Sequence, residues 1–509
     1  MAAKLITPHC FLAKLDLKDA YYLVAVRQCS RKYLRFYFRD ILYEFTCLPF
    51  GLCTAPFVFT KILKPILATL RGAGWQSIVY LDDFLLLAQS FEQCLANVAA
   101  TCTLLRDLGF LFSAKKCVFP PVTQCTFLGF EFNSVDMTMS LPAEKREKLT
   151  KLVTQLSQRS TCTIRDYARF LGSLVAASPA LRYAWVYTKQ LERDKIRALQ
   201  TNEGNYEAKF LLTNRAEDYD WWKGALQTGS MPLSLPPFSL EIFSDASLTG
   251  WGASRGPLTA RGQWTPEERS LHINALELLA ALFSLRSFTR DLSNANILLR
   301  VDNTTAIAYI NRMGGTHSGQ LNSITRAIWQ YCEESQLWVV ASYIRSAENV
   351  VADAESRELN PETEYELSEV EFIRLTRHFG APTIDLFASR LNAKCQKFCS
   401  WKRDPEAVVI DAFTIPWNKE FFYAFPPFSI ILRVLHKIVR DQAEGIVIVP
   451  NWPSQPWFPR FSALLIAPPL ILFPNISLLL SVDRKPHPLH KTLSLVAGLL
   501  SGKRLARGT

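Results

Sequence analysis

The stretch SIVYLDDFLLLAQS, Ser77 to Ser90, places two adjacent aspartates, Asp82 and Asp83, between two apolar runs. Apolar runs on either side of a short polar segment predict two strands joined at a hairpin. Two carboxylates inside apolar strand sequence cost free energy unless something offsets their charge. Because hard oxygen ligands suit Mg²⁺, the pair predicts a divalent-cation site, and a simple β-turn is the alternative for this stretch alone.

A third aspartate lies upstream of this pair. The stretch FLAKLDLKDAYYLVAV, Phe11 to Val26, alternates apolar and polar residues, which predicts a strand that carries Asp16 near its end. A third carboxylate would complete the oxygen ligands of a metal site. We therefore take Asp16, Asp82 and Asp83 as one candidate set.

Four more motifs surround these aspartates in a fixed order. They are LDLKDAYY (Leu15–Tyr22), LPFGLCTAPFVF (Leu48–Phe59), GFLFSAKKCVF (Gly109–Phe119) and FLGFEF (Phe127–Phe132). Together with YLDD, they resemble the motifs of reverse transcriptases in type and in order. An aromatic or basic residue in a loop is common, so the specific signal is the ordered set.

The resemblance implies a role for each motif. The three aspartates would hold two Mg²⁺ (or Mn²⁺) ions, which activate a 3′-hydroxyl and stabilise the leaving pyrophosphate. Tyr21 would gate against a ribose 2′-hydroxyl, and Phe50 would lie beside the incoming base. Lys115 or Lys116 would protonate pyrophosphate, and FLGFEF would form the primer-grip hairpin.

One difference from the reverse transcriptase pattern concerns the fingers. Relatives carry a strand-rich fingers segment before the first motif, with basic residues that hold the triphosphate. Here about fifteen residues precede Asp16, so the sequence indicates an N-terminally truncated polymerase. The segment RKYLRFYFRD, Arg31 to Asp40, keeps part of the fingers charge.

A second set of acids lies in the middle of the chain. Asp245 should end a strand in LEIFSDASLTGWGA, and Asp302 should follow a strand in ILLRVDNTTAIAYI. Glu277 lies on an apolar helical face in NALELLAALFSLRSF, where a carboxylate is more typical of a site than of a solvated surface. Asp353 should begin a helix in ENVVADAESR, where capping of that helix is the alternative role.

Four acids from separate elements suit two-metal phosphodiester hydrolysis. Their order and flanks resemble ribonuclease H, which implies that Asp245, Glu277, Asp302 and Asp353 are its metal ligands. That family commonly has a histidine before the last aspartate, where this chain has Tyr343. His317, in GGTHSGQ, could compensate, although an exposed polar loop is the simpler interpretation.

Two further regions complete the resemblance. Thr163–Lys195 resembles the thumb and connection of reverse transcriptases, and its Lys and Arg residues would follow a duplex backbone. Ala381–Ser429 resembles the C-terminal region of DIRS-type retroelement polyproteins, which is similar to phage-type adenine-N6 DNA methyltransferases. Its loop YAFPPF has Pro426, Pro427 and Phe428, with Phe425 where an amide or acid belongs.

This methyltransferase-like region has two other acids of interest. Asp385 and Asp411 could belong to a remnant cofactor pocket, and a structural or nucleic-acid-docking domain is the alternative. DIRS-type elements integrate through a tyrosine recombinase, whose Arg-His-Arg-Tyr set is absent from this sequence. We also find no HHCC zinc module of an integrase. The resemblance therefore implies a separately encoded recombinase.

Composition bounds these interpretations. The chain has 509 residues, of which 49% are hydrophobic and 20% charged, as in globular proteins. Its net charge of +11 favours a polyanionic partner. The 12 scattered cysteines indicate a reduced, intracellular setting, in the cytoplasm, the nucleus or both. Prolines interrupt the most apolar stretch, 461–482, so we expect no membrane-spanning helix.

We therefore expect a multidomain protein of α/β and α+β classes. The expected parts are a right-hand polymerase palm with partial fingers (1–140), thumb and connection helices (141–228), a linker (229–240), a ribonuclease H-like α/β domain (241–358), a small α/β methyltransferase-like domain (372–460) and an apolar, then basic tail (461–509). The acidic stretch 358–369 should mark a further boundary.

The expected function is that of a retrotransposon RNA-directed DNA polymerase with ribonuclease H activity. Its partners would be an RNA template, a DNA primer, RNA–DNA hybrid and deoxynucleoside triphosphates, with no membrane. Two alternatives remain: an inactive nucleic-acid-binding relic, and a protein in which only the ribonuclease H part is active.

Overall fold

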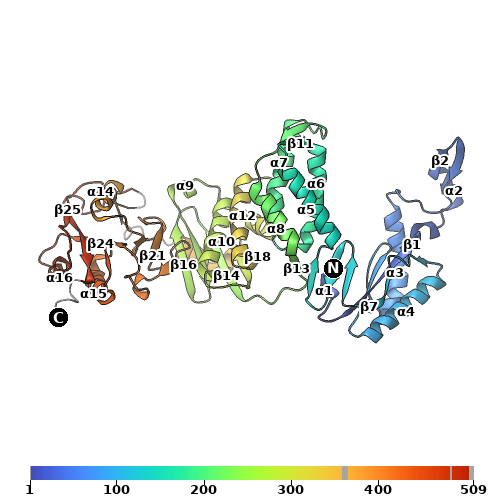
Figure 1. Ribbon diagram of the computed structural model, residues 1–509, viewed down its shortest axis with the longest axis horizontal. Helices are drawn as coiled ribbons and strands as arrows, with labels where there is room; N and C mark the ends of the chain where they lie inside the picture. Colours follow the sequence, from blue (N-terminus) through green and yellow to red (C-terminus); the bar gives the residue numbers. More distant parts are fainter. Residues whose placement is uncertain (1, 358–364, 482–483, 504–509) are drawn as a thin grey trace. The chain divides into compact units, whose positions relative to one another are not determined.

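The computed structural model describes residues 2–357, 365–481 and 484–503. The chain divides into two compact units, residues 1–236 and 237–509. The division falls inside the proline-rich segment 229–240 that the sequence predicts as a linker. Each unit mixes helices with sheets, as expected for a multidomain α/β and α+β chain (Figure 1).

The first unit begins with an antiparallel sheet of order β4-β5-β1-β6, with β7 also paired to β1. Its strands are β1 (Phe11–Lys18), β4 (Gln76–Tyr80), β5 (Asp83–Ala88), β6 (Leu111–Phe112) and β7 (Val118–Val122), and its helices are α3 (Ala55–Gly72) and α4 (Phe91–Asp107). Alternate residues of β5 enter two cores: Phe84 and Leu86 pack with α3 and α4, whereas Leu85 and Leu87 enter the core on the opposite face. The sheet is thus buried on both faces.

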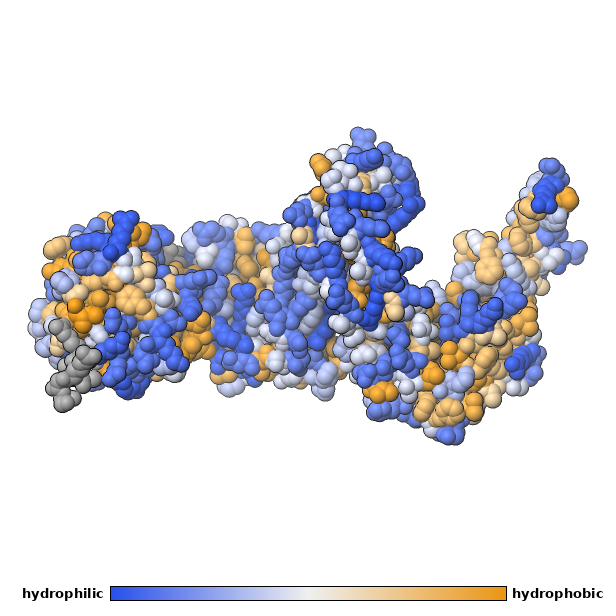
Figure 2. Space-filling view, in the orientation of Figure 1, coloured by the Kyte–Doolittle hydropathy of each residue, from blue (hydrophilic) through white to orange (hydrophobic). Residues whose placement is uncertain are grey.

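A short hairpin extends from this sheet (Figure 1). It consists of β2 (Arg35–Phe38) and β3 (Ile41–Glu44), and follows α2 (Gln28–Arg31). All eight strand residues are exposed, so they contribute no core. Hydrophobic residues also reach the surface around α3 and α4 (Figure 2).

A second sheet and a helical segment complete this unit. The sheet has the order β13-β10-β9-β8, with β8 (Gln124–Phe127), β9 (Phe130–Asn133), β10 (Thr138–Ser140) and β13 (Ser230–Pro232). The helices are α5 (Ala143–Ser157), α6 (Ile164–Ala177), α7 (Val186–Thr201) and α8 (Ala216–Thr228), with a small ribbon of β11 (Thr161–Thr163) and β12 (Lys209–Leu211). The helix-rich expectation for 141–228 agrees with these bounds, and FLGFEF forms the expected hairpin through Leu128 and Gly129.

Two sequence-based boundaries in this unit were wrong. The strand expected over Phe11–Val26 ends at Lys18, because Asp19 has a left-handed φ of 53° and starts a 3₁₀ turn over Ala20–Leu23. The start of the predicted linker belongs to the fold, because β13 pairs with β10.

The second unit starts with a mixed sheet of order β16-β15-β14-β17-β18. Its strands are β14 (Leu240–Ala246), β15 (Gly250–Arg255), β16 (Leu258–Gln263), β17 (Asn296–Val301) and β18 (Trp338–Tyr343), and its helices are α9 (Pro266–Arg269), α10 (Ile273–Thr289), α11 (Thr304–Asn311), α12 (Gly319–Glu334) and α13 (Val350–Arg357). Since β14, β17 and β18 are parallel, their carboxyl ends meet at one edge of the sheet.

A seven-stranded sheet of order β22-β21-β20-β23-β24-β27-β25 forms the rest of this unit. Its strands are β20 (Ile384–Asp385), β21 (Lys397–Ser400), β22 (Val409–Ile410), β23 (Phe422–Ala424), β24 (Glu444–Pro450), β25 (Leu470–Leu472) and β27 (Leu495–Ser501), and its helices are α14 (Glu369–Phe379), α15 (Ile431–Asp441) and α16 (Phe458–Ala463). The first five strands in sequence are parallel, and β27 runs antiparallel to both neighbours. A separate ribbon pairs β19 (Tyr365–Leu367) with β26 (Leu479–Ser481).

The expected bounds of this last region differ from the structure. The sequence suggests a domain over 372–460 and a separate tail, but β25 and β27 continue its sheet and Val496 and Leu500 enter its core. The apolar residues of the supposed tail are therefore strand residues. No helix among the described residues is long and apolar enough to cross a membrane. Parts of the acidic boundary (358–364) and of the basic end (504–509) lie outside the described residues.

The two sheets of the second unit are joined through Arg390. Its guanidinium donates to Glu268 of α9 and to the carbonyl of Gln263, and it lies over the Phe283 ring of α10 at 4.5 Å. The Arg390 side chain is only 6% exposed. Buried, multiply bonded guanidinium groups are strong anchors, so this contact ties the seven-stranded region to α9 and α10.

Candidate functional site

The N-terminal carboxylate cluster consists of Asp16, Asp82 and Asp83. Asp16 in β1 lies opposite Asp83 in β5, and Tyr80 pairs with Asp83, which leaves Asp82 in a two-residue loop. The Leu17 N–H donates to the Asp82 carbonyl at 3.0 Å and ties this loop to β1. The structure thus brings together the three acids that the sequence selects.

The other loop residue, Leu81, has a left-handed backbone with φ of 55°. Hairpins with two-residue loops favour positive φ because it matches the twist of the strands, and glycine or asparagine usually occupies such positions. A leucine there costs about 1–2 kcal/mol. The turn that presents Asp82 is therefore held by the flanking strands.

Two lysines lie near the cluster. Lys116 Nζ is 3.5 Å from Asp16 Oδ2, and Lys14 Nζ is 3.4 Å from Asp83 Oδ1. Burial raises the pKa of Asp16, the positive charge of Lys116 lowers it, and the Asp83 and Asp82 charges raise it further. Asp83 Oδ1 is buried and accepts no hydrogen bond among the described residues. A buried oxygen without a hydrogen-bond donor suits a cation ligand.

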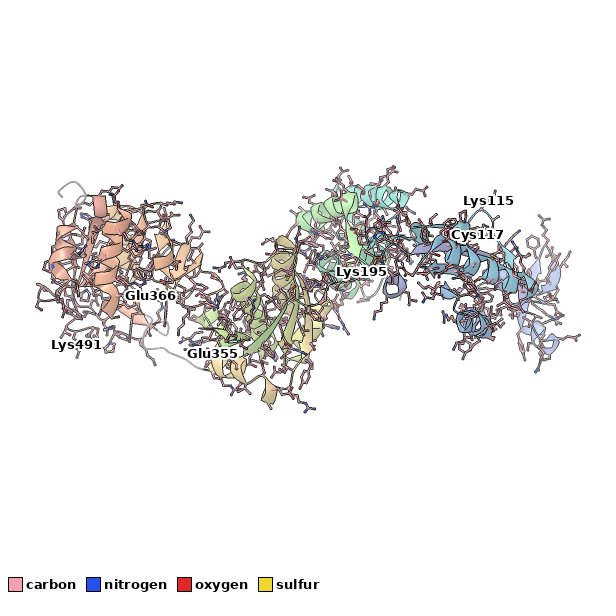
Figure 3. The ribbon with its side chains drawn as sticks, turned by 90° about the horizontal axis from the view of Figure 1, so that it is seen from below. Lys115, Cys117, Lys195, Glu355, Glu366 and Lys491 are labelled. Carbon is pink, nitrogen blue, oxygen red and sulfur yellow. The ribbon has the colours of Figure 1, made fainter. Side chains whose placement is uncertain are left out.

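The loop after β6 determines which lysine reaches the cluster. The Ser113 N–H donates to the Asp16 carbonyl at 2.9 Å, and the Asp16 N–H donates to Cys117 Sγ at 3.3 Å. Lys115 and Cys117 both lie on this loop (Figure 3). Lys116, rather than Lys115, forms the ion pair with Asp16. The sequence analysis missed Cys117, because only the pairing of β1 with β6 and β7 shows that this thiol supports Asp16.

The two aromatic candidates lie together. The rings of Tyr21 and Phe50 are 5.0 Å apart, and Tyr21 also contacts Phe59 at 5.1 Å. Tyr21 is 9% exposed, whereas Phe50 is 59% exposed. Burial, followed by the charge of Asp82, raises the pKa of Tyr21. Tyr21 is therefore buried near Asp82, and Phe50 beside it is largely exposed.

The second carboxylate cluster consists of Asp245, Glu277 and Asp302. One ligand oxygen from each of these residues lies within 4.8 Å of the others. Asp245 comes from β14, and Asp302 directly follows the neighbouring parallel strand β17, while α10 supplies Glu277. The cluster thus forms at the edge where the carboxyl ends of two parallel strands meet.

Few groups compensate these charges. Ser356 Oγ donates to Asp245 Oδ2 at 2.8 Å, and Ser346 Oγ donates to Asp302 Oδ2 at 2.6 Å. Glu277 Oε2 is buried without a hydrogen-bond partner, and burial, with Asp245 and Asp302, raises the Glu277 pKa to about 9. Burial also raises the pKa of Asp245, although the Ser356 bond opposes it. The group that fits such an uncompensated acidic cluster is a divalent cation.

The fourth acid, Asp353, lies outside this set of three. It lies in α13, and its Oδ1 accepts from Arg357 Nη2 at 2.7 Å. The close approach of α13 to β15 requires glycine, because a Cβ on Gly252 would be 2.2 Å from the Ala352 carbonyl oxygen. Gly252, Ser356 and Arg357 were not predicted from the sequence, although GWG and ESR lie next to the acids that were.

Tyr343 and His317 do not join the cluster. Tyr343 ends β18 and is 54% exposed, and His317 is exposed in the loop before α12. Within the described part of the chain, neither side chain hydrogen-bonds to the three acids. Ser346 and Asn349 fill the loop before α13 instead, and the Asn349 amide donates to the Ser244 carbonyl at 3.1 Å.

The third candidate region lies at the carboxyl edge of the seven-stranded sheet. Pro426, Pro427 and Phe428 follow β23 after one intervening residue, Phe425, and the Phe428 ring contacts Trp452 at 5.4 Å. Asp385 ends β20, is fully buried, and accepts N–H bonds from Phe387 and Lys394. Burial raises its pKa to about 6.

Two other residues of this region bear on the sequence-based expectations. Asp411 follows β22 and accepts from the Phe413 N–H at 3.0 Å. Phe425, in place of an amide or acid, packs at 6.4 Å from Phe428. Both Asp385 and Asp411 therefore bond to backbone of their own loops.

Comparison with known proteins agrees with the first motif set. Residues 2–132 match the family described as reverse transcriptase (RNA-dependent DNA polymerase). The enzymatic polyproteins of Cauliflower mosaic virus (strain CM-1841) and Figwort mosaic virus (strain DxS) are each 26% identical over 68% of this chain and 50% of theirs. The putative enzymatic polyprotein of Cassava vein mosaic virus is 24% identical over 70% of this chain and 54% of its own. The chain spans about half the length of these curated relatives.

Solved structures with some similarity include two foamy viral protease-reverse transcriptase complexes. One, with double-stranded DNA, has a TM-score of 0.41 and 16% identity over 67% of this chain and 58% of that one. The other, with RNA/DNA hybrid, has a TM-score of 0.39 and 14% identity over 67% and 45%. The family match therefore assigns a reverse transcriptase domain to residues 2–132, and the similarity to the enzymatic polyproteins extends over about two thirds of this chain.

Proposed function

We propose that this chain is an RNA-directed DNA polymerase that also cleaves the RNA strand of RNA–DNA hybrids. The observation that carries the proposal is the register of β1 and β5, which sets Asp16 opposite Asp83 beside the Asp82 loop within the reverse transcriptase domain. The partners would be an RNA template, a DNA primer and deoxynucleoside triphosphates.

The N-terminal carboxylate cluster would hold Mg²⁺ or Mn²⁺ for nucleotidyl transfer. Bound divalent ions supply activation of a 3′-hydroxyl and charge stabilisation of leaving pyrophosphate. Buried Asp16 fits that role, and so does Asp83 Oδ1, which within the described residues accepts no hydrogen bond and has only the Lys14 ammonium near it. Lys116, which is 66% exposed beside Asp16, would donate a proton to pyrophosphate, and Tyr21 would exclude a 2′-hydroxyl while Phe50 contacts the incoming base.

The second carboxylate cluster would perform hybrid cleavage. Asp245, Glu277 and Asp302 are close enough to share one cation, and Asp353 would complete the set once its Arg357 partner turns away. Bound metal would supply an activated water and stabilise the leaving oxygen. The orphaned Glu277 Oε2 supports this assignment, because the buried oxygen has no other partner.

Basic residues of the helical segment would hold the duplex. Arg169 of α6 is 73% exposed, and Lys151 of α5 is 68% exposed. Exposed cations on neighbouring helices can follow a phosphate backbone. We accordingly assign α5–α8 as a thumb and connection.

A second function is favoured by the strand order of the C-terminal sheet. Parallel strands on both sides of β20 and β23 create a switch point, where ligands of doubly wound sheets bind. The YAFPPF loop lies at this point, which supports a methyltransferase-like domain of a DIRS-type element that relies on a separate tyrosine recombinase. Photo-crosslinking of radiolabelled S-adenosylmethionine to the chain tests this second function. We expect crosslinks to residues between Asp385 and Phe428, and a chain that acquires no crosslink would contradict cofactor binding.

The main experiment uses a labelled RNA–DNA hybrid with a recessed primer, Mg²⁺ and nucleotides. We expect Asp82→Asn to reduce primer extension, and Asp245→Asn to reduce RNA cleavage, each on the order of 10³-fold. Each variant serves as the control for the other. If the wild type cleaves RNA but does not extend the primer, the function is limited to ribonuclease H. If the wild type shows neither activity, the chain is an inactive nucleic-acid-binding relic. Fractionation of cells that express the chain tests the proposed location in cytoplasm or nucleus.

A further inference from the structure

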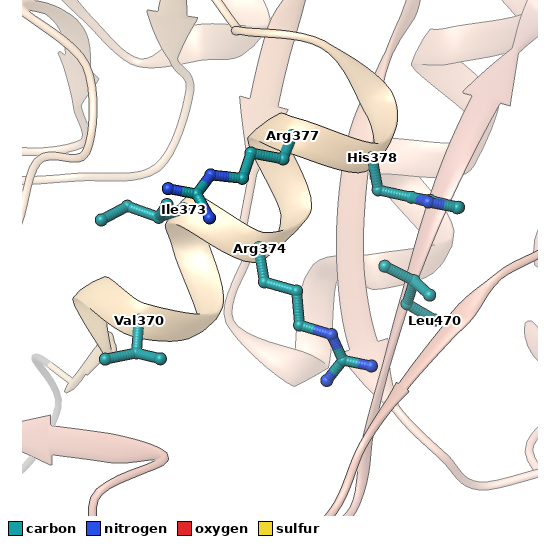
Figure 4. Close-up of a pocket in the computed structure, with 6 residues that line it drawn as sticks. All are labelled: Val370, Ile373, Arg374, Arg377, His378 and Leu470. Atoms are coloured by element: carbon teal, nitrogen blue, oxygen red, sulfur yellow. The ribbon is translucent and has the colours of Figure 1, made fainter.

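A pocket of about 500 Å³ lies between α14 and the edge strand β25, and no residue of either carboxylate cluster lines it. Its lining residues are Val370, Ile373, Arg374, Arg377, His378 and Leu470 (Figure 4). We propose that this pocket binds a phosphate monoester of nucleotide size, with its phosphate on Arg374 beside His378 and its apolar part on the aliphatic side chains that line the pocket. The proposal does not depend on either proposed nuclease or polymerase activity.

Five of the six lining residues form one stripe of α14. They recur at positions 370, 373, 374, 377 and 378, which is the spacing of a single helical face. The opposite face, with Phe372, Leu375 and Phe379, is buried in the core. The stripe is therefore not required for packing of the helix.

The stripe changes character along the helix. Val370 and Ile373 are aliphatic and exposed, at 76% and 40%. Arg374, Arg377 and His378 follow toward the C-terminal end. Cations at a helix C-terminus offset its dipole, but the dipole gives no reason for two exposed aliphatic residues beside them. The combination of an apolar wall and a cationic end is typical of a small-ligand site.

The guanidinium group of Arg374 can reach a ligand beside Leu470, whereas Arg377 extends from α14 in the opposite direction (Figure 4). Arg374 is 52% exposed and shares its charge with Glu371 at 3.2 Å, whereas Arg377 forms no ion pair within the described residues. Arg374 and His378 extend from α14 on the side where Leu470 lies (Figure 4). A guanidinium matches phosphate oxygens with two parallel N–H bonds, so phosphate is the anion that this arrangement favours.

A peptide ligand fits the pocket less well. Pairing with the sheet edge would need a free run of backbone, but β25 has three residues and lies between Pro469 and Pro474. Short edge strands flanked by proline resist strand addition. The volume also lies within the range of small-molecule sites. A free nucleotide and the terminal phosphate of a nucleic acid strand share the required chemistry.

The test uses the full chain in EDTA and a fluorescent N-methylanthraniloyl derivative of adenosine 5′-monophosphate. The pocket variant is Arg374→Glu. The matched control is Arg440→Glu, which changes net charge equally at a residue 70% exposed in the same domain. We expect saturable binding that weakens at least about tenfold in the pocket variant and stays within about twofold in the control.

Competition then distinguishes the two sources. Displacement of the probe by a 5′-phosphorylated oligonucleotide, but not by its 5′-hydroxyl form, would assign the pocket to strand ends; displacement only by unlabelled adenosine 5′-monophosphate would assign it to free nucleotides. Adenosine itself should not compete. Absence of saturable binding, equal loss in both variants, or stronger displacement by a polyglutamate peptide would overturn the proposal.

Discussion

The two carboxylate clusters balance their charges differently. In the N-terminal cluster, Lys116 and Lys14 form ion pairs with Asp16 and Asp83. In the second cluster, none of the three acids forms an ion pair within the described residues, and the polar partners of Asp245 and Asp302 are serine hydroxyls. The first cluster is partly compensated by two lysines of its own chain, whereas the second depends on a proton or a bound cation.

This difference predicts different responses to a metal. A cation that enters the N-terminal cluster must compete with the lysine ammonium groups already beside the acids. Its binding therefore relieves less repulsion between carboxylates than it does in the second cluster. In the second cluster it replaces the proton on Glu277 and relieves the repulsion among three acids. Divalent ions should therefore stabilise the second unit more than the first.

The largest expected effect concerns Glu277 and pH. Its pKa is raised from 4.5 to about 9 in the folded chain, so the folded state keeps a proton that the unfolded state loses. Stability of the metal-free protein should fall as pH rises from about 4.5 toward about 9, by up to about 5 kcal/mol at pH 8. Glu277→Gln should remove this dependence, as measured by calorimetric unfolding in EDTA between pH 5 and 8.

The Glu277→Gln variant also tests metal binding. Mg²⁺ or Mn²⁺ should raise the unfolding temperature of the wild type at pH 8 and have little effect on Glu277→Gln. Asp353→Asn, outside the set of three, is the comparison variant and should keep most of the pH dependence. Parallel pH curves for the wild type and Glu277→Gln would show that Glu277 is not the group that titrates.

The next effect concerns the close contact of β15 with α13. Gly252→Ala would place a Cβ 2.2 Å from the Ala352 carbonyl oxygen and 2.3 Å from the Ser356 N. We expect a loss of about 1–3 kcal/mol from overpacking, together with displacement of Asp353 and of the Ser356 bond to Asp245. Urea unfolding and hybrid cleavage measure the two consequences.

A glycine in the first unit provides the matched control. Gly224 lies within α8, and a Cβ there would meet no atom within 4 Å. Gly224→Ala should stabilise by about 0.5–1 kcal/mol, since alanine is the better helix former. A neutral Gly252→Ala would mean that α13 can move away from β15 without cost.

Sequence patterns located the acids because the acids interrupt apolar elements. Asp82 and Asp83 interrupt strand sequence, and Glu277 interrupts a buried helix, so each stands out where burial of charge requires a reason. Their partners lack such contrast. Lys14, Cys117 and Ser356 are ordinary residues in their own segments, and only strand pairing or helix packing brings them to the acids.

The predicted boundaries of several strands were wrong for a related reason. The residues of β25 and β27 are apolar, and prolines surround β25, so their sequence does not show that they extend a sheet begun more than sixty residues earlier. Such pairing over long separations is absent from local patterns. The end of β1 at Lys18 depends on one left-handed residue, Asp19, within a sequence that continues to alternate.

The smallest expected effect concerns Lys14. Its side chain is 18% exposed and lies 3.4 Å from Asp83 Oδ1. Lys14→Met keeps the apolar stem but removes the charge. Asp83 then has no ion pair with Lys14, and in this respect the N-terminal cluster should resemble the second cluster. We expect a loss of about 1 kcal/mol in EDTA, because a partly buried carboxylate loses its partner.

Added Mg²⁺ sharpens the comparison, because it should restore more stability to Lys14→Met than it adds to the wild type. Lys116→Met is the control: that lysine is 66% exposed, and exposed pairs contribute little, about 0–1 kcal/mol. Urea unfolding of the three proteins with and without Mg²⁺ provides the measurement. An equal Mg²⁺ response in the wild type and Lys14→Met would show that Lys14 does not compete with the metal, and the contrast between the two clusters would then rest on burial rather than on the lysines.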